Sequence, residues 1–269
     1  MPVSPDSAPK RIGFGRVAED YEITRGFPTE LMKQLIEDII YTCELAPTTL
    51  VLELGCGAGR YLRELAHRQI PVIGLDISPG MIDKARRNQQ SRKYLRSNLL
   101  VSDAVTLPFH QGQFFSVIAI HLFHLLTDWQ EVLFEALRVL QPGGTFVLGY
   151  VQGRHHGSML DRLYRQRREE LGYYYDYPGP HSSQISAELE AQGFRVEAHS
   201  FMAETEVPFQ ETLSVLERRV YSSMWEGLPD VVHRQLIQHV RKAASSQFKR
   251  LDDMEKITCK AELFFAAHD

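Results

Sequence analysis

The sequence is poor in cysteine, and its three cysteines form no recognisable framework. Cys43, Cys56 and Cys259 are widely spaced, and no C-x-x-C pair occurs. Disulfide-dependent secreted domains and structural zinc sites both need paired, closely spaced cysteines. We therefore expect a chain that folds around a hydrophobic core in a reducing compartment and holds no metal ion.

Long hydrophobic runs are also missing. A membrane-spanning helix needs about twenty consecutive apolar residues, and the most apolar segment, 114–126, is interrupted by His121 and His124. Residues 1–10 are polar and lack the apolar core of a signal peptide. These absences predict a cytoplasmic protein without a membrane span.

Neither sign of charge is in large excess. The chain has 30 Lys and Arg against 34 Asp and Glu, for a formal net charge of −4 and a pI near 6.3. This balance argues against a protein dominated by polyanion binding, so nucleic acid is not the expected partner. Two basic runs, 84–96 and 162–168, leave local docking open, although a solvated helix face is the usual explanation for such runs.

Apolar residues make up 43% of the 269 positions, which is enough for one domain with a sizeable core. Residues 28–41 have their apolar positions at helical spacing, and buried-strand runs then alternate with helical patterns up to Tyr150. Because parallel strands need such crossovers, this half is expected to form a doubly wound α/β sheet, with its ligand at the carboxyl ends of the strands.

One of these junctions carries a glycine loop. Residues 51–59 read V-L-E-L-G-C-G-A-G, and a second apolar run, 71–75, ends in Asp76. A strand that delivers a glycine loop to a helix start lets a ligand lie against bare backbone, where side chains on these glycines would occupy its space. The Asp76 carboxylate, placed beside the loop, can accept hydrogen bonds from a ribose diol. Together they predict a nucleoside site.

The loop lacks the features of two common phosphate sites. The dinucleotide fingerprint G-x-G-x-x-G requires a third glycine where this chain has Arg60, and the Gly-Lys-Ser/Thr of a P-loop is absent. An acidic residue, an apolar residue and then G-x-G-x-G, here residues 53–59, resemble instead the first motif of the class I S-adenosylmethionine-dependent methyltransferases.

The resemblance continues in order through residues 13–150, and Phe115 stands where the family usually has an aspartate. The matching segments are V-S-D-A at 101–104, L-P-F at 107–109, the apolar run 114–120, H-L-F-H-L-L-T-D-W at 121–129 and R-V-L-Q-P-G-G-T at 138–145.

This resemblance implies a Rossmann-like, mostly parallel seven-stranded sheet with an antiparallel last strand, and S-adenosyl-L-methionine as cofactor. Asp76 would hold the ribose, Asp103 would read the adenine, and the glycine loop would face the methionine part. The residues expected to contact the cofactor are Tyr21, Arg25, Glu53, Gly55, Cys56, Gly57, Gly59, Asp76, Ile77, Met81, Asp103, Ala104 and His121.

We expect one domain in three parts. Residues 1–150 would supply the leading helix and the cofactor-binding core, residues 151–192 an inserted lid over the substrate, and residues 193–269 the strands and helices that complete the sheet. Helices are expected near 162–170, 182–192, 210–223 and 231–247, and strands at 194–202 and 257–266.

Methyl transfer needs mainly alignment and exclusion of water, so no catalytic motif is obligatory. Where a general base is used, histidine suits neutral pH. The candidates are His121, at the end of the fourth strand, and His155, in a glycine-flanked loop after the fifth. The tyrosines of 173–177 could contact an aromatic substrate or the sulfonium, or could cover the sheet edge.

The sequence thus predicts a methyltransferase acting on a small organic acceptor and resembling the quinone-biosynthesis branch. An RNA or protein methyltransferase that docks through the basic helices is one alternative, although the Asn-Pro-Pro-Tyr or Asp-Pro-Pro-Tyr signature of base-amino methyltransferases is absent. A non-catalytic cofactor-binding scaffold is the other. The acceptor and the oligomeric state stay open.

Overall fold

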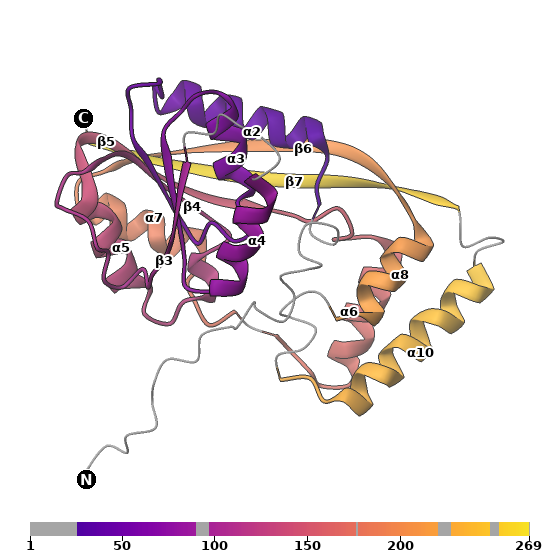
Figure 1. Cartoon of the computed structure of the whole chain (residues 1–269). Coiled ribbons are helices and arrows are strands. Elements are labelled where there is room, and N and C mark those ends of the chain that lie inside the picture. Colours follow the sequence, from indigo (N-terminus) through magenta and orange to yellow (C-terminus); the bar gives the residue numbers. More distant parts are fainter. Residues whose placement is uncertain (1–25, 90–96, 176, 220–226, 248–252, 269) are drawn as a thin grey trace, which may run out of the picture.

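Seven strands form one sheet at the centre of the computed structural model, which describes residues 26–89, 97–175, 177–219, 227–247 and 253–268 (Figure 1). The strand order is β3-β2-β1-β4-β5-β7-β6. The strands are β1 (Val51–Leu54), β2 (Val72–Asp76), β3 (Ser97–Val101), β4 (Phe114–Ile120), β5 (Leu140–Val151), β6 (Arg195–Pro208) and β7 (Met254–Ala267).

Strand direction follows the prediction. Strands β1 to β5 pair in parallel, and β7 lies between β5 and β6, antiparallel to both. All four residues of β1 are buried, as expected for a parallel strand covered on both faces. The predicted doubly wound sheet with an antiparallel last strand is confirmed.

Helices cover both faces of the sheet, and a further group lies beyond it at the far end of β6 and β7 (Figure 1). The helices are α2 (Thr29–Thr42), α3 (Arg60–His67), α4 (Pro79–Gln89), the 3-10 turn η2 (Phe123–Leu125), α5 (Trp129–Val139), α6 (Met159–Glu170), α7 (Ser182–Ala191), α8 (Phe209–Glu217) and α10 (Asp230–Gln247).

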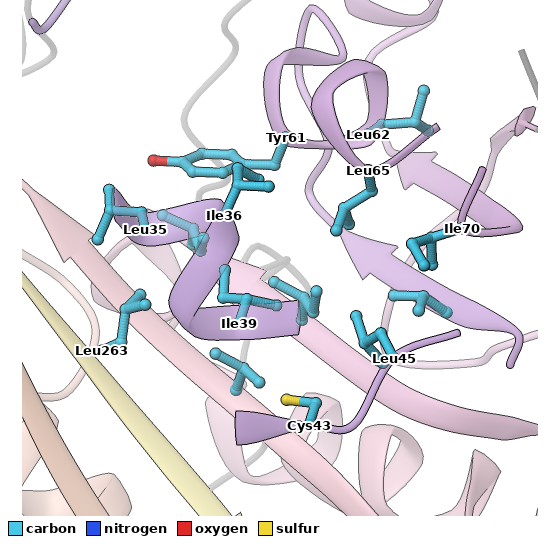
Figure 2. Packing of buried hydrophobic residues seen from close by; sticks show 14 of the residues in the cluster. Leu35, Ile36, Ile39, Cys43, Leu45, Tyr61, Leu62, Leu65, Ile70 and Leu263 are labelled. Carbon is cyan, nitrogen blue, oxygen red and sulfur yellow. The ribbon is translucent and has the colours of Figure 1, made fainter. Parts of the chain in front are cut away.

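The amphipathic pattern of the first described helix, α2, fixes the core on one face of the sheet. Leu35, Ile36 and Ile39 lie on one side of α2 and are fully buried. Figure 2 shows these side chains against Tyr61 of α3 and Leu263 of β7. Because α2 packs on β6 and β7 as well as on α3, it joins the two halves of the sheet.

The start of β5 is irregular. The strand begins at Leu140 and includes the Pro-Gly-Gly segment. Its pairing with β4 passes from Phe114 and Leu140 to Ser116 and Thr145, so the extra residues of this step lie in β5. A Cβ on Gly144 would lie 2.7 Å from the carbonyl oxygen of Phe115, and the glycine therefore lets β5 pass close to β4 at this step.

Helices α6, α8 and α10 form a separate apolar cluster, in which Leu160 and Tyr164 of α6 pack with Leu216 and Leu236. Helix α7 instead packs on β6 and β7. The predicted lid, 151–192, is therefore divided. Its first helix, α6, packs with α8 and α10 of the C-terminal part, because these helices bury the apolar side of α6. Its second helix, α7, covers the sheet.

We expect Ile39→Ala to lower the free energy of unfolding by about 2–5 kcal/mol, because Ile39 is fully buried and the substitution leaves a cavity. Tyr41→Ala in the same helix is the matched control, since Tyr41 is 85% exposed and its loss changes stability by about 0.5 kcal/mol or less. Urea denaturation of both variants measures the difference. Equal effects would contradict the placement of α2 on the sheet.

Candidate functional site

The ends of β1 and β2 are joined by one carboxylate. Asp76, the last residue of β2, accepts a hydrogen bond from the backbone N–H of Gly57 at Oδ2 (2.9 Å) and another from Ser78 at Oδ1 (2.8 Å). Ser78 then receives the N–H of Met81 on its hydroxyl (3.3 Å) at the start of α4. Asp76 thus holds the glycine loop and the next helix start in one arrangement.

The glycines of this loop are required by the backbone itself. Gly55, Gly57 and Gly59 have φ angles of +65°, +53° and +76°, in the left-handed region that other residues rarely adopt. A Cβ on Gly55 would also lie 2.9 Å from Cδ1 of Leu122, and a Cβ on Gly59 would lie 3.1 Å from Cβ of Ala85. The prediction that side chains here would occupy a ligand's space therefore needs correction at these two glycines, where protein atoms already fill that space.

Cys56 contributes its backbone to the loop and its side chain to the interior. The residue is 5% exposed, and a Cβ on Gly74 of β2 would lie 2.9 Å from its Sγ. Burial raises the pKa of the thiol, so it stays protonated. Any ligand of the loop can contact Cys56 only through backbone atoms.

Glu53, in β1 just before the loop, is a buried acid. The residue is 3% exposed, and its Oε2 has no hydrogen-bond partner among the described residues. Burial raises the pKa of Glu53 to about 8; a backbone hydrogen bond from Leu62 opposes the shift, and nearby Asp76 adds to it. Burial also raises the pKa of Asp76. Because Glu53 keeps its proton at neutral pH, Asp76 is the flanking acid that carries negative charge, and a carboxylate beside the loop disfavours a phosphate.

The next strand extends this edge of the sheet. The N–H of Ser102 donates to the carbonyl oxygen of Asp76 (3.1 Å), and Oδ1 of Asp103 accepts the N–H of Val105 (3.1 Å). Ile77 beside them is 48% exposed, whereas Met81 and Ala104 are 2% and 8% exposed. The structure therefore brings Asp76, Ile77 and Asp103 to one edge and places Met81 and Ala104 in the interior.

His121 follows β4 with a φ angle of +59°, a strained conformation for a residue with a side chain. Its own N–H donates to the carbonyl oxygen of Gly149 (2.9 Å), and its Nε2 accepts the N–H of Val151 (3.0 Å). The lone pair of Nε2 is therefore already used. His121 lies at the expected edge, but in this arrangement it cannot take up a proton at Nε2.

His155 does not lie in an open loop. It is 1% exposed, with Nδ1 3.1 Å from Oγ1 of Thr212 and Nε2 3.4 Å from Oε1 of Glu211, both in α8. Burial lowers its pKa to about 4, and the charge of Arg154 contributes. The prediction that His155 is a general base needs correction, because the imidazole is enclosed and binds a proton weakly at neutral pH. The flanking glycines gave no indication of the packing by α8.

Two predicted site residues, Tyr21 and Arg25, lie outside the described residues. Two residues at this edge of the sheet were not expected from the sequence, Leu122 against Gly55 and Tyr150 near the end of β5. The position of Tyr150 at the carboxyl end of a predicted strand was the signal that could have identified it.

The second basic run is largely paired with acids. In α6, Arg165 contacts Asp161 (2.9 Å), Arg167 contacts Glu170 (2.8 Å), and Arg168 is 7% exposed. The positive charges on this face of α6 are therefore compensated by acids or buried. In the first run, residues 90–96 lie outside the described residues.

Metal and membrane features are absent from the parts of the chain that the structure describes. No group of three or more histidine, cysteine or acidic side chains is arranged to hold a metal ion there. Among the helices of those parts, none combines the length and apolar character needed to cross a membrane.

The buried acid makes the stability depend on pH in a definite direction. Folded Glu53 keeps its proton to about pH 8, whereas an ordinary glutamate ionises near 4.5. Between these values the folded state binds more protons, so the free energy of unfolding falls as the pH rises. Glu53→Gln removes this contribution, and its stability should fall less steeply between about pH 5 and pH 8, by up to about 1.4 kcal/mol for each pH unit.

Urea denaturation at several pH values measures this slope. Glu37→Gln, on the exposed side of α2, is the matched control and should keep the slope of the unchanged protein. An unchanged slope in Glu53→Gln would show that Glu53 is ionised in the folded state.

Comparison with known sequences finds a family model that covers this site. Residues 52–148 match the family described as "Methyltransferase domain". Malonyl-[acyl-carrier protein] O-methyltransferase of Legionella pneumophila is 32% identical over 133 residues, which are 49% of this chain and 45% of that protein. Demethylmenaquinone methyltransferase of Thermus thermophilus is 36% identical over 121 residues, 44% of this chain and 54% of that protein. The matches thus span about half the length of these relatives.

Solved structures show the same fold over more of the chain. The YcgJ protein of Bacillus subtilis superposes with a TM-score of 0.59 at 17% identity, covering 90% of this chain and 99% of that one. Phosphoethanolamine N-methyltransferase 2 of Haemonchus contortus, in complex with S-adenosyl-L-methionine, gives 0.54 at 19% identity, covering 93% and 56%. Residues 52–148 are thus similar to a methyltransferase domain, and the chain shares the fold of these solved structures.

Proposed function

We propose that this protein transfers a methyl group from S-adenosylmethionine to a small organic acceptor. The observation that carries the proposal is the buried Glu53 and the partly buried Asp76 on either side of a glycine loop within a methyltransferase domain. The Asp76 carboxylate can accept hydrogen bonds from a ribose and disfavours a phosphate beside the loop, which matches S-adenosylmethionine, a nucleoside without phosphate groups.

The residues present fit this cofactor. Each Asp76 oxygen accepts one backbone N–H, and a carboxylate oxygen can accept two hydrogen bonds, so both oxygens keep capacity for ribose hydroxyls. Oε2 of Glu53, which has no partner among the described residues, can accept from the ammonium group, directly or through water. Backbone atoms of the loop from Gly55 to Gly59 would complete the methionine side.

The adenine is assigned to the neighbouring edge. Half-exposed Ile77 offers an apolar surface for the ring, and Asp103 would receive the amino group, with Met81 and Ala104 supporting this wall from the interior. Tyr21 and Arg25 stay predictions as covering residues.

Bound S-adenosylmethionine would supply an activated methyl group, and the protein has then to align the acceptor and exclude water. His121 contributes by its rigid placement, because its Nε2 holds the N–H of Val151. We assign it a positioning role in place of the predicted general base.

A small acceptor is favoured over RNA or protein because the arginines of α6 are paired or buried. The names of the relatives, a demethylmenaquinone methyltransferase and a malonyl-[acyl-carrier protein] O-methyltransferase, also point to small organic groups. The quinone-biosynthesis branch is the first set of acceptors to screen.

We expect the protein to bind S-adenosylmethionine and S-adenosylhomocysteine, and not NAD, in calorimetric titrations. Asp76→Asn should weaken both interactions by about ten- to a hundredfold, because ribose hydroxyls lose a charged acceptor. Asparagine keeps the side-chain shape and one acceptor for the loop, so the variant is expected to stay folded.

Asp83→Asn is the matched control, since the Asp83 side chain is 65% exposed on α4, and its affinity should not change. Unchanged affinity in a folded Asp76→Asn variant would overturn the ribose assignment. Failure of the unchanged protein to bind either sulfur nucleoside would overturn the proposed function.

A further inference from the structure

Tyr150 has a buried hydroxyl that the fold does not use. The residue is next to last in β5, and its hydroxyl has no hydrogen-bond partner among the described residues. Burial raises the pKa of this phenol to about 12, so the group stays neutral and can donate a proton in a hydrogen bond. A buried polar group without a partner destabilises a protein, and such groups call for an explanation.

His121 holds the backbone on both sides of Tyr150. Its N–H donates to the carbonyl oxygen of Gly149, and its Nε2 accepts the N–H of Val151, so one residue fixes the strand before and after position 150. To make these two contacts, His121 adopts a strained left-handed backbone conformation. Backbone strain at the carboxyl end of a strand is typical of functional sites, and this favours a functional role for the fixed position of Tyr150.

The rings of His124 and Tyr177 form an aromatic group beside Tyr150. The ring of His124, in η2, lies 5.8 Å from the ring of Tyr150 and 4.6 Å from that of Tyr177, centroid to centroid. The segment that carries Tyr177 is anchored by Gly179, whose N–H donates to the carbonyl oxygen of His124 (3.0 Å). A Cβ on Gly179 would lie 2.0 Å from the carbonyl oxygen of Phe123, so only glycine allows this approach.

This aromatic group adjoins the glycine loop. Leu122, between His121 and η2, would be 2.9 Å from a Cβ on Gly55. Tyr150 and Leu122 also pack in the same core cluster on one face of the sheet. The glycine loop after β1 and Tyr150 near the end of β5 therefore lie at the same edge of the sheet, on either side of β4.

We propose that Tyr150 orients the acceptor by donating a hydrogen bond to an oxygen of a flat aromatic molecule, with His121 as the residue that positions Tyr150. This inference rests on the proposed function and names the acceptor class of that site. The aromatic rings of His124 and Tyr177 provide apolar surface for such a molecule, and the phenol provides its polar contact.

The first test needs no ligand. If the Tyr150 hydroxyl has no partner in the protein, Tyr150→Phe removes an unsatisfied buried group, and the thermal midpoint should rise by about 2–4 °C. Tyr174→Phe is the matched control, because Tyr174 is 74% exposed in the neighbouring segment, and its midpoint should not move. A lower midpoint in Tyr150→Phe would assign the hydroxyl a structural role and overturn the proposal.

The second test measures hydroxyl recognition with two probes, 2-naphthol and 2-methylnaphthalene, titrated onto the protein saturated with S-adenosylhomocysteine. The unchanged protein and Tyr174→Phe should prefer 2-naphthol, and Tyr150→Phe should reduce that preference by about tenfold. Equal preference in all three proteins, or no binding of either probe, would overturn the inference. If S-adenosylhomocysteine itself does not bind, the proposed function fails first, and the two failures are thereby distinguished.

The positioning role of His121 requires a double-mutant cycle. Asparagine tolerates the left-handed conformation but cannot reproduce the imidazole contact with the N–H of Val151. His121→Asn should reduce the preference for 2-naphthol in the unchanged background and have no further effect in Tyr150→Phe. Additive effects would show that His121 does not act through Tyr150.

Discussion

The hydrogen bonds that Asp76 accepts from Gly57 and Ser78 are the interaction on which the site depends. These bonds connect the loop after β1 to the start of the helix after β2. They thereby hold the loop, with its three glycines of positive φ, at the carboxyl edge of the sheet. Because the carboxylate is largely buried and its backbone donors are uncharged, its charge is stabilised by dipoles alone. The lone pairs that remain on its oxygens suit ribose hydroxyls, so under the proposed function the contact that builds the loop also holds the ligand.

Much of the fold could be predicted from local patterns. The apolar spacing of α2 and the glycine loop before α3 were each sufficient to place an element, because each depends on residues close in sequence. The lengths of β6 and β7 were underestimated, since their outer halves are partly exposed and carry charged residues. These parts are stabilised by pairing with each other, as at Glu206 and Lys256, which periodicity within one segment cannot reveal.

The site, too, could be predicted where it depends on residues close in sequence and not where it depends on distant ones. Asp76 ends a strand that the sequence identified, whereas Asp103 was placed by the resemblance alone; they share an edge because parallel strands end together. His155 was misjudged because the residues that enclose it, Thr212 and Glu211, lie more than fifty positions later. Tyr150 was overlooked for a related reason: whether a phenol finds a partner is decided by the whole neighbourhood, and no local pattern records an unmet hydrogen bond.

The position of β7 between β5 and β6 has a consequence for how the chain is made. Strand β6 pairs only with β7 among the described strands, and β5 meets its last neighbour only when residues 261–267 arrive. During synthesis β5, which ends at Val151, and β6, which ends at Pro208, therefore keep open edges until β7, which begins at Met254, leaves the ribosome. The sheet is completed only when β7 enters between them, so its last step joins segments that are far apart in the sequence.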